Sequence, residues 1–550
     1  MIFFQIFIFV VSIVLLSFSI SGYGKLINSK IKNNFFLDIF LGFIVISFII
    51  TTLHFFLNIN LIISFSILTF GLILFFYKKN LYFSELLKKK NIFSLVVFFI
   101  FIPMFLSQKY HEDFGYYHLP YALGFLEEKI VFGYANIDKS YVYNSIWLNL
   151  YSIFFLYDKN FDFLTVPSYL LFLAFILFSV NQIITNKKKS ISDYYLITIL
   201  FYFILKFTRI SEFGVDLPSI IFSILGIYYF MKFSEINSIK EKKEYFFLTI
   251  IFSIFAILIK LSTLPIIILP LYIFFKNYKY LKFSILNFKY FFVILLFTTY
   301  FIQQFIYTGC FIFPTNLTCF EVSWFNSEYL KLSKELELVN KSYFQEAKKT
   351  YSPEQYLNNF NWLYFWIKRN FIEILEHFLT IIIPSLLFLF FLKKENKINN
   401  MFKEKVALYI LLFASLIFWL NFSPVYRFAI HLFATLTFII ISGIFLYKKF
   451  SKKVFIIFVA IFVSFSFSKN IIRLNSVESI YLGIQKINNK YVLNKSITNE
   501  FAKVFYPDVK NNFKNGWQGR LCWNTPFICS YNKLEVSKKN GYLIINKLKN

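Results

Sequence analysis

The sequence predicts an all-α protein that crosses a membrane many times. Of its 550 residues, 58% are hydrophobic, and the mean hydropathy is +0.61. A soluble domain of this length needs far more polar surface. Apolar runs close to the 20 residues that span a bilayer recur along the chain, separated by lysine-rich segments. We therefore expect about 14 transmembrane helices, within a range of 12 to 14.

The expected spans follow the apolar runs in chain order, and the count is least certain around 144–157 and 245–275. They are residues 2–20, 36–56, 59–77, 91–107, 163–182, 192–208, 216–232, 245–259, 262–275, 290–307, 373–392, 406–421, 429–447 and 454–468. Two further apolar segments, 141–157 and 361–371, are short and rich in aromatic residues. We expect both to form helices in the outer interface, with Trp362 and Trp366 in an aromatic belt.

The loops between these spans alternate in charge, and this alternation assigns their sides. Lysine-rich loops are expected in the cytoplasm, and the alternate loops outside. The lysine-rich set is 22–34, 78–90, 185–190, 232–244, 276–289, 393–405 and 448–453. The formal charge of +28 therefore reflects topology, and we expect no nucleic-acid partner.

Both chain termini are expected outside the cell. The apolar run at the N-terminus lacks a preceding basic region, which favours a retained anchor over a cleaved signal peptide. Residues 1–468 then form a multi-pass domain with outer loops 108–162 and 308–372. Within the second loop, 326–358 is charged and helix-prone, which predicts a small external cap. Residues 469–550 are expected to form a small extracytoplasmic domain.

The cysteines provide a separate test of this topology. The chain has four, Cys310 with Cys319 in the second outer loop and Cys522 with Cys529 in the tail. Close pairs on an oxidising face predict two local disulfides, Cys310–Cys319 and Cys522–Cys529. Four free thiols are the alternative.

The most unusual polar motif is HEDFGYYHLP, residues 111–120, at the start of the first outer loop. It contains the acidic pair Glu112 and Asp113, followed by Tyr116, Tyr117 and His118. The acidic pair is either a solvated turn or part of a site at the mouth of the bundle. A metal-ligand role for His111 and His118 is disfavoured, because their spacing matches no strong metal motif.

Four other ionisable residues fall where a predicted span meets the outer surface. They are Glu212, Asp216, Lys260 and Arg427. Such groups usually face a water-filled cavity or pair with one another. Lys260 can instead extend to the lipid headgroups, and Arg427 either anchors the interface or binds phosphate with its planar fork. The chain contains no Walker sequence, GxSxG or HExxH, which argues against an ATP-driven pump and a zinc protease.

An early outer loop with an acidic pair, followed by Tyr, His and an aromatic-rich juxtamembrane segment, resembles the GT-C superfamily of integral-membrane glycosyltransferases. The resemblance covers about residues 111–125 and is closest to bacterial members that depend on polyprenyl-phosphate sugars. Here the motif follows four predicted spans, whereas the family usually has it after the first.

The resemblance implies a GT-C-like fold and sugar transfer from a polyprenyl-phosphate donor to a glycan, lipid or protein acceptor outside the membrane. Asp113 is then the catalytic base, with Glu112 orienting it or helping it to hold a divalent cation such as Mg²⁺ or Mn²⁺. Arg427 and Lys260 are the candidate phosphate ligands. The remaining candidate substrate-binding residues are Tyr116, Tyr117, His118, Glu212 and Asp216. The location implied is the bacterial inner membrane.

Three alternatives stay open. A transporter or flippase of lipid-linked saccharides uses the same outward cations but needs a path to the cytoplasmic half. A polymerase or ligase of lipid-linked glycans does not require the acidic pair. A structural assembly factor requires no catalytic residue at all.

Overall fold

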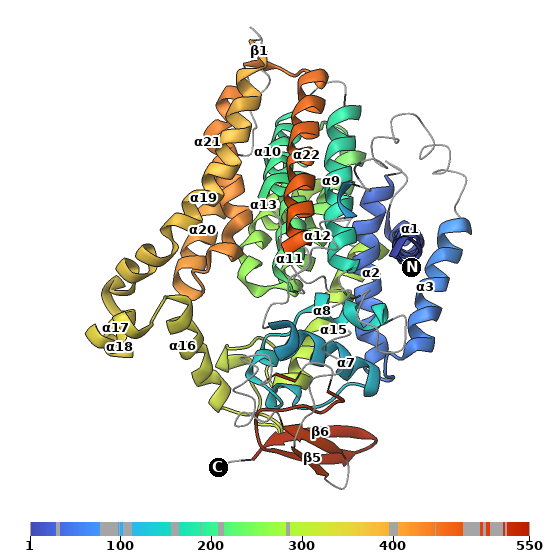
Figure 1. The fold of residues 1–550 in the computed structure, drawn as a ribbon, viewed down its shortest axis with the longest axis vertical. Coiled ribbons are helices and arrows are strands. Elements are labelled where there is room, and N and C mark those ends of the chain that lie inside the picture. Colours follow the sequence, from blue (N-terminus) through green and yellow to red (C-terminus); the bar gives the residue numbers. More distant parts are fainter. Residues whose placement is uncertain are drawn as a thin grey trace.

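The computed structural model shows a helical bundle with smaller elements gathered at one end (Figure 1). It describes residues 2–28, 34–77, 113–155, 166–186, 189–206, 214–281, 287–394, 405–445, 447–476, 495–498, 502–506, 521–522 and 525–548, with the isolated positions 97, 100–102 and 164. The predicted span 91–107 lies almost wholly outside these residues.

Long apolar helices make up the bundle. Within hydrocarbon every backbone N–H and C=O needs a partner inside its own segment, so apolar runs of this length fold as helices. The bundle helices are α1 (Ile2–Ile27), α2 (Phe35–His54), α3 (Leu61–Tyr77), α9 (Val166–Thr185), α10 (Ile191–Lys206), α11 (Asp216–Glu235), α12 (Ile239–Ile259), η8 (Leu261–Ile267), α13 (Ile268–Lys276), α14 (Tyr278–Leu281), α15 (Phe288–Thr308), α19 (Trp362–Phe390), α20 (Lys405–Phe422), η12 (Tyr426–Ala429), α21 (Ile430–Phe445) and α22 (Lys452–Ser476).

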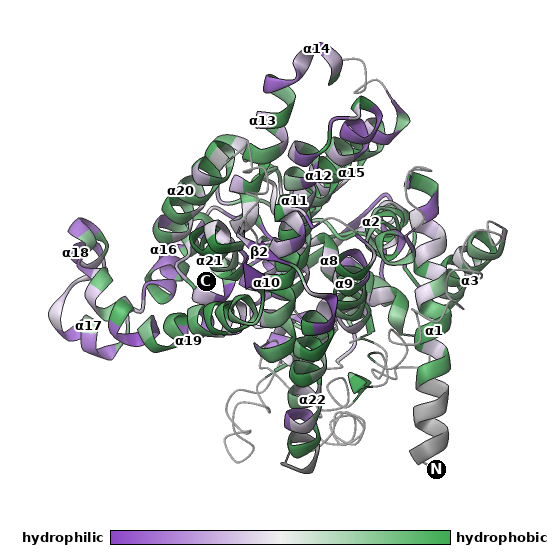
Figure 2. Ribbon diagram, turned by 90° about the horizontal axis from the view of Figure 1, so that it is seen from above, coloured by the Kyte–Doolittle hydropathy of each residue, from purple (hydrophilic) through white to green (hydrophobic). Residues whose placement is uncertain are grey.

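Eight of the described helices are long and apolar enough to cross a membrane. They include Val10–Ile27, Phe35–His54, Val166–Thr185, Asp216–Glu235, Phe288–Thr308, Trp362–Phe390, Tyr426–Phe445 and Lys452–Ile472. Three shorter apolar helices are Leu61–Tyr77, Leu261–Lys276 and Val406–Phe422. Hydrophobic residues cover most of the bundle, whereas hydrophilic ones concentrate on short helices such as α17 and α18 (Figure 2). The chain is thus predominantly helical, with the helices of a multi-pass membrane protein.

Glycines allow the first three helices to pack closely. A Cβ atom on Gly22 of α1 would lie 2.0 Å from the backbone oxygen of Gly71 in α3. A Cβ atom on Gly42 of α2 would lie 1.9 Å from the Ile20 oxygen of α1. No side chain fits at these distances, so the close approach depends on glycine, as is common between membrane helices.

Short elements lie below the bundle and, for α17 and α18, at its left side in Figure 1, and they belong to the loops that were predicted to share the outer side. They are η3 (Phe114–His118), α7 (Leu119–Glu127), η4 (Tyr134–Asn136), η5 (Lys139–Val142), α8 (Ile146–Leu150), η6 (Tyr151–Phe154), η10 (Asn316–Thr318), α16 (Glu328–Asn340), α17 (Gln345–Thr350), α18 (Pro353–Leu357) and η11 (Asn358–Phe360). The three helices α16 to α18 agree with the helix-prone cap predicted for 326–358.

The described strands form two-stranded antiparallel pairs. They are β1 (Lys393–Lys394) with β2 (Lys448–Lys449), β3 (Lys495–Thr498) with β4 (Lys503–Tyr506), and β5 (Leu534–Lys539) with β6 (Tyr542–Lys547). β1 lies at the upper end of Figure 1, and the β5–β6 hairpin lies at the lower end. Two lysine-rich loops therefore meet at the end opposite to the C-terminal hairpin.

The two aromatic segments, which we expected to form helices in the outer interface, bury their tryptophans inside the protein. Residues 361–371 are continuous with the following span in α19, and Trp362 and Trp366 are buried against Trp419 of α20. The described part of the other segment, 141–155, contributes only short helical turns, and its Trp147 is fully buried in the main core. Tertiary packing therefore buries the large rings of both segments, as is usual for aromatic side chains with so much apolar area.

Candidate functional site

Residues 113–155, which belong to the first predicted outer loop, are anchored to the bundle by a buried polar network. The Tyr121 hydroxyl of α7 donates to the Asn149 side-chain oxygen at 2.8 Å. Asn149 Nδ2 donates in turn to Thr51 Oγ1 of α2 at 2.8 Å and to Gln303 Oε1 of α15 at 3.1 Å. Asn144 Nδ2 donates to the same Gln303 oxygen at 2.9 Å. Because buried polar groups are costly unless paired, this network fixes the loop on α2 and α15.

The C-terminal hairpin covers the outer surface of the same loop. The Phe132 N–H donates to the Leu543 carbonyl at 3.0 Å, and the Ile545 N–H donates to the Phe132 carbonyl at 2.9 Å. Ser530 Oγ adds a hydrogen bond of 2.7 Å to the Ile137 carbonyl. The described part of the tail therefore packs on the loop that carries the acidic motif.

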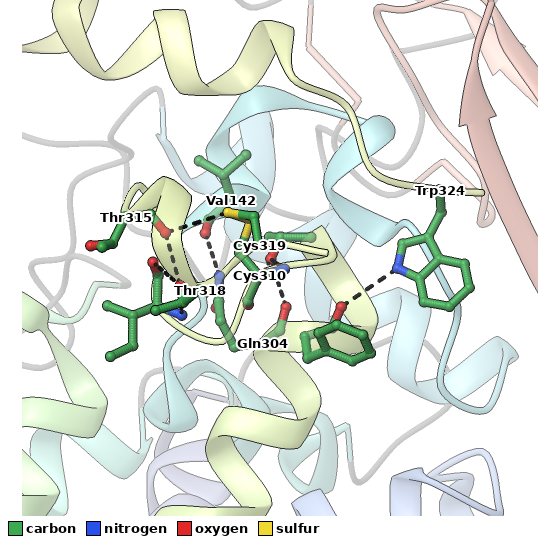
Figure 3. Close-up of a disulfide and its surroundings, with 10 residues drawn as sticks. Val142, Gln304, Cys310, Thr315, Thr318, Cys319 and Trp324 are labelled. Atoms are coloured by element: carbon green, nitrogen blue, oxygen red, sulfur yellow. Dashed lines mark hydrogen bonds between the residues drawn. A yellow bond between two sulfur atoms is a disulfide. The ribbon is translucent and has the colours of Figure 1, made fainter. Parts of the chain in front are cut away.

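Both predicted disulfides are present. Cys310–Cys319 closes the turn that follows α15, and Cys522–Cys529 closes a turn in the tail. Beside the first disulfide, Gln304 Nε2 of α15 donates to the Val142 carbonyl at 2.8 Å (Figure 3). A disulfide restrains the loop that it closes, so both disulfides stiffen the end of the bundle where the site lies.

Three of the predicted site residues meet in one ion-pair arrangement. Asp216 is the first residue of α11, Lys260 lies at the break between α12 and η8, and Arg427 lies in η12. Asp216 forms an ion pair with Lys260 through Oδ1, and its Oδ2 lies 3.2 Å from Arg427 Nε. Two cations therefore share the Asp216 carboxylate. The buried Arg427 Nε–H lies at ion-pair distance from it but forms no hydrogen bond with any described residue.

Asp113 belongs to the same group of charges. It immediately precedes η3, and its carboxylate interacts electrostatically with Lys260, Arg427 and Tyr117. Burial raises the pKa of the Tyr117 hydroxyl well above 10, and the carboxylates of Asp113 and Asp216 raise it further. We call Asp113, Asp216, Lys260 and Arg427 the outer cluster, after the face on which the sequence predicts them to lie.

The pKa of Lys260 reflects both its burial and its charged neighbours in the outer cluster. Burial lowers the pKa of its ammonium group to about 8, and the nearby Asp216 carboxylate opposes that shift. Its Nζ atom lies 3.0 Å from the ring centroid of Phe428, which follows Arg427. An aromatic face attracts a cation, so Phe428 helps to retain the charge of Lys260.

The remaining predicted residues are divided between this site and its border. Tyr116 donates to Asp138 Oδ2 at 2.8 Å, and its ring lies 5.2 Å from that of Tyr531 in the tail. His118 is buried, and its ring centroid lies 4.1 Å from that of Tyr117. His118 thus lies beside the outer cluster, whereas Tyr116 joins the loop to the tail.

Three predicted residues, His111, Glu112 and Glu212, lie outside the described residues. Within the part of the chain that the structure describes, no three His, Cys, Asp or Glu side chains come together as metal ligands. Asp216 is already paired with two cations. The cation site that the sequence places at Glu112 and Asp113 lies partly outside the described residues.

Asp138, Phe428 and Tyr531 did not stand out in the sequence. Asp138 is buried and accepts hydrogen bonds from Tyr116 and from the Ser140 N–H at 2.8 Å each. Burial raises the pKa of its carboxyl group, and these two hydrogen bonds oppose that rise. An isolated acid in a loop and two aromatic residues in an aromatic-rich chain give no sequence signal of their own.

Fold and site define a helical multi-pass membrane protein with a charged, tyrosine-bordered site at one end of its bundle. Residues 1–434 match the model of the family described as Domain of unknown function (DUF8201), and the chain belongs to this family. The match includes every member of the outer cluster. No curated protein and no solved structure matches the chain.

Proposed function

We propose that the chain is an integral-membrane glycosyltransferase of the GT-C type. Its donor is a sugar linked to polyprenyl phosphate, and its acceptor is a glycan, lipid or protein on the outer side of the membrane. The observation that carries the proposal is the outer cluster, where Lys260 and Arg427 both pair with the Asp216 carboxylate and interact with Asp113. Cations at the edge of a membrane domain suit a lipid-linked phosphate.

In the proposed reaction, the acceptor oxygen attacks the anomeric carbon of the donor sugar. The bond between that carbon and the phosphate oxygen breaks, and its electron pair leaves with the polyprenyl phosphate. Arg427 and Lys260 stabilise the departing phosphate, in part by exchanging their contacts with Asp216 for contacts with the phosphate. Asp113 accepts the proton of the acceptor hydroxyl. Tyr117 and His118, which lie beside these charges, contact the sugar.

The proposal includes a topology of about 14 spans, with both termini and the outer cluster on the extracytoplasmic face of a bacterial inner membrane. The two disulfides support this side, because such bonds persist in oxidising compartments. A flippase or a glycan polymerase is the alternative. It shares the requirement for phosphate-binding cations but not the requirement for Asp113.

The deciding experiment compares glycolipids in cells that lack the protein with those in cells that express Asp113→Asn. We expect both to accumulate the same polyprenyl-phosphate-linked sugar, whose mass identifies the donor. Glu321→Gln, at an exposed acid in the second outer loop, is the matched control and should restore the wild-type profile. If Asp113→Asn also restores that profile, the glycosyltransferase proposal is wrong and a flippase or polymerase is favoured.

A further inference from the structure

The loop that carries Arg427 is held by two tryptophan side chains outside the outer cluster. Trp366 Nε1 of α19 donates to the Pro424 carbonyl at 2.6 Å. Trp419 Nε1 of α20 donates to the next carbonyl, that of Val425, at 2.9 Å. Two consecutive carbonyls just before η12 are thus bound by indole donors from two different helices.

Both indoles are rigidly placed. Trp366 is 6% exposed and Trp419 is 7% exposed, and their ring centroids lie 5.5 Å apart. They belong to a second hydrophobic core, separate from the main core, which includes Trp362, Tyr356 of α18 and Ala347 of α17. The external helices therefore support the tryptophans that hold the loop.

A third hydrogen bond joins the same loop to the external helices. Asn340 Nδ2, at the end of α16, donates to Ser423 Oγ at 3.0 Å. Ser423 lies directly before Pro424, so three consecutive residues, 423 to 425, are bound by side chains from α16, α19 and α20. The 3₁₀ turn η12, with Arg427, begins at the next residue.

Indole N–H groups suit this role because they donate one hydrogen bond in a fixed direction and accept none. The Val425 carbonyl also accepts from the Phe428 N–H at 3.0 Å, so the Trp419 indole adds a second bond to it, and each indole bond favours one orientation of its peptide group. Fixing two adjacent peptide groups fixes the direction in which the chain enters η12. On the side of α11, Asp216 forms an ion pair with Arg427, and the Lys260 ammonium lies over the Phe428 ring. The Arg427 guanidinium is therefore placed from two sides.

We propose that Trp366 and Trp419 are positioning residues, which set the direction of the Arg427 guanidinium toward Asp216 and toward an anionic ligand. The consequence for sugar transfer rests on the proposed function, whereas the effect on the Arg427–Asp216 ion pair does not. The external helices α16 to α18 then belong to the site indirectly, because the core that they form keeps both indoles in place.

The first test needs no substrate. Melting temperatures of the detergent-solubilised protein are measured for Asp216→Asn, Arg427→Gln and the double variant, which together give the coupling between the two side chains. The same cycle is repeated with Trp366→Phe and Trp419→Phe together, which keeps two large rings but removes both indole donors. We expect the coupling to fall by about twofold or more.

Trp362→Phe is the matched control for these variants. Trp362 is buried in the same core, 6.1 Å from Trp366 between ring centroids, and its indole forms no hydrogen bond with loop 423–427 in the described chain. We expect Trp362→Phe to lower the melting temperature without changing the coupling. An unchanged coupling in the Trp366/Trp419 variant, or an equal loss in Trp362→Phe, would overturn the proposal.

The second test measures the kinetics of transfer, once glycolipid analysis has identified the donor. The Trp366/Trp419 variant should raise KM for the donor about tenfold with a smaller change in kcat, because the misplaced cation meets the phosphate in the ground state as well. A purely structural role would lower the amount of folded enzyme and leave KM unchanged. If no transfer is found at all, the proposed function fails, and the melting cycle still decides the role of the tryptophans.

Discussion

Two charged clusters stand at opposite ends of α11, and they differ in how completely their charges are satisfied. The outer cluster includes Asp216 at the first residue of this helix. The second, which we call the α10–α11 cluster, consists of Asp193, Lys232 and Glu235 with Ser190, Ser192 and Asn186 near the other end. A helix of 20 residues is about 30 Å long, so the two clusters act independently.

In the α10–α11 cluster every described acid has local partners. Asp193 is completely buried and accepts from Asn186 Nδ2 at 2.9 Å, from Lys232 Nζ at 3.1 Å and from the Ser190 N–H at 3.1 Å. Glu235 accepts from the Ser192 N–H at 2.8 Å. Carboxylates at a helix N-terminus stabilise the helix, so these residues connect α11 to the start of α10.

The charges of the outer cluster are less completely buried and hydrogen-bonded. Its side chains are 15% exposed at Lys260, 30% at Asp216 and 32% at Arg427. Buried Arg427 Nε forms no hydrogen bond with the described residues. Buried charges whose hydrogen-bonding groups are all paired indicate a structural role. Partly exposed charges with an unpaired N–H donor indicate ligand binding. The predictions below test this contrast, beginning with the largest expected effect.

Removing the Arg427 cation should affect chemistry far more than folding. Under the proposed function, Arg427→Gln should lower sugar transfer by about 10³-fold, because a positioned cation stabilises the departing phosphate. The melting temperature in detergent should fall by only about one or two degrees, since a partly exposed ion pair contributes at most about 1 kcal/mol to stability. Transfer assays with the purified variant, beside its melting curve, check both halves. If activity and the amount of folded protein fall equally, Arg427 has a structural role like that of the α10–α11 cluster.

The α10–α11 cluster should respond in the opposite way. Asp193→Ala removes the closer of the two described ion pairs of Lys232 and a carboxylate from the start of α10, so it should destabilise the protein by about 3 kcal/mol. Transfer activity per folded molecule should persist. Thermal unfolding and activity of the same preparation provide the measurement. A variant that folds normally but is inactive would show that this end of the bundle also has a functional role.

The pH dependence of anion binding should report on Lys260. Because burial lowers its pKa to about 8, the ammonium charge is lost as pH rises through that value. Binding of a short-chain prenyl phosphate should weaken above pH 8, by at most about tenfold per pH unit. Lys260→Arg is the control, because a guanidinium stays charged and should give a flat profile. A wild-type profile that is also flat would exclude Lys260 from the anion site.

Stability should change with pH in the opposite direction. The lysine of the unfolded chain keeps its proton up to about 10.5, whereas the folded chain loses it near 8. Between these values the unfolded state binds more protons, so the contribution of Lys260 to the stability of the folded state rises with pH. Unfolding of wild type and Lys260→Arg over this window separates this contribution from those of other groups.

The sequence predicted much of the bundle, because hydrophobic runs and lysine-rich loops are properties that each segment carries by itself. Bundle helices overlap every expected span except 91–107, which lies almost wholly outside the described residues, and eight of the described helices are long and apolar enough to cross a membrane. The aromatic segments were harder to place. The sequence of 361–371 is that of an interfacial helix, and only packing against α20 shows that Trp362 and Trp366 are buried. Burial between helices depends on partners that a local pattern does not contain.

The candidate site divides in the same way. Asp113, Asp216, Lys260 and Arg427 stand out as charges beside apolar spans, so the sequence identified them individually. Their convergence depends on how α11, α12 and η12 pack, and a single sequence does not specify that packing. The supporting residues Phe428, Trp366 and Trp419 were not predicted as parts of the site, because one aromatic residue more has little meaning in a chain that is 23% aromatic.

The smallest expected effect concerns Asp216, which both cations of the outer cluster share. Asp216→Asn removes the carboxylate that competes with a phosphate, so affinity for a short-chain prenyl phosphate at pH 7 should rise by about two- to fivefold. Asp216 also raises the pKa of Lys260, so the pH at which binding weakens should move below that of wild type. Glu235→Gln, at the other end of α11, should change neither quantity. If Asp216 competes with the phosphate, its removal raises the affinity, and if Asp216 orients the two cations, its removal lowers the affinity. A lower affinity in Asp216→Asn would therefore mean that Asp216 holds the cations in their binding positions.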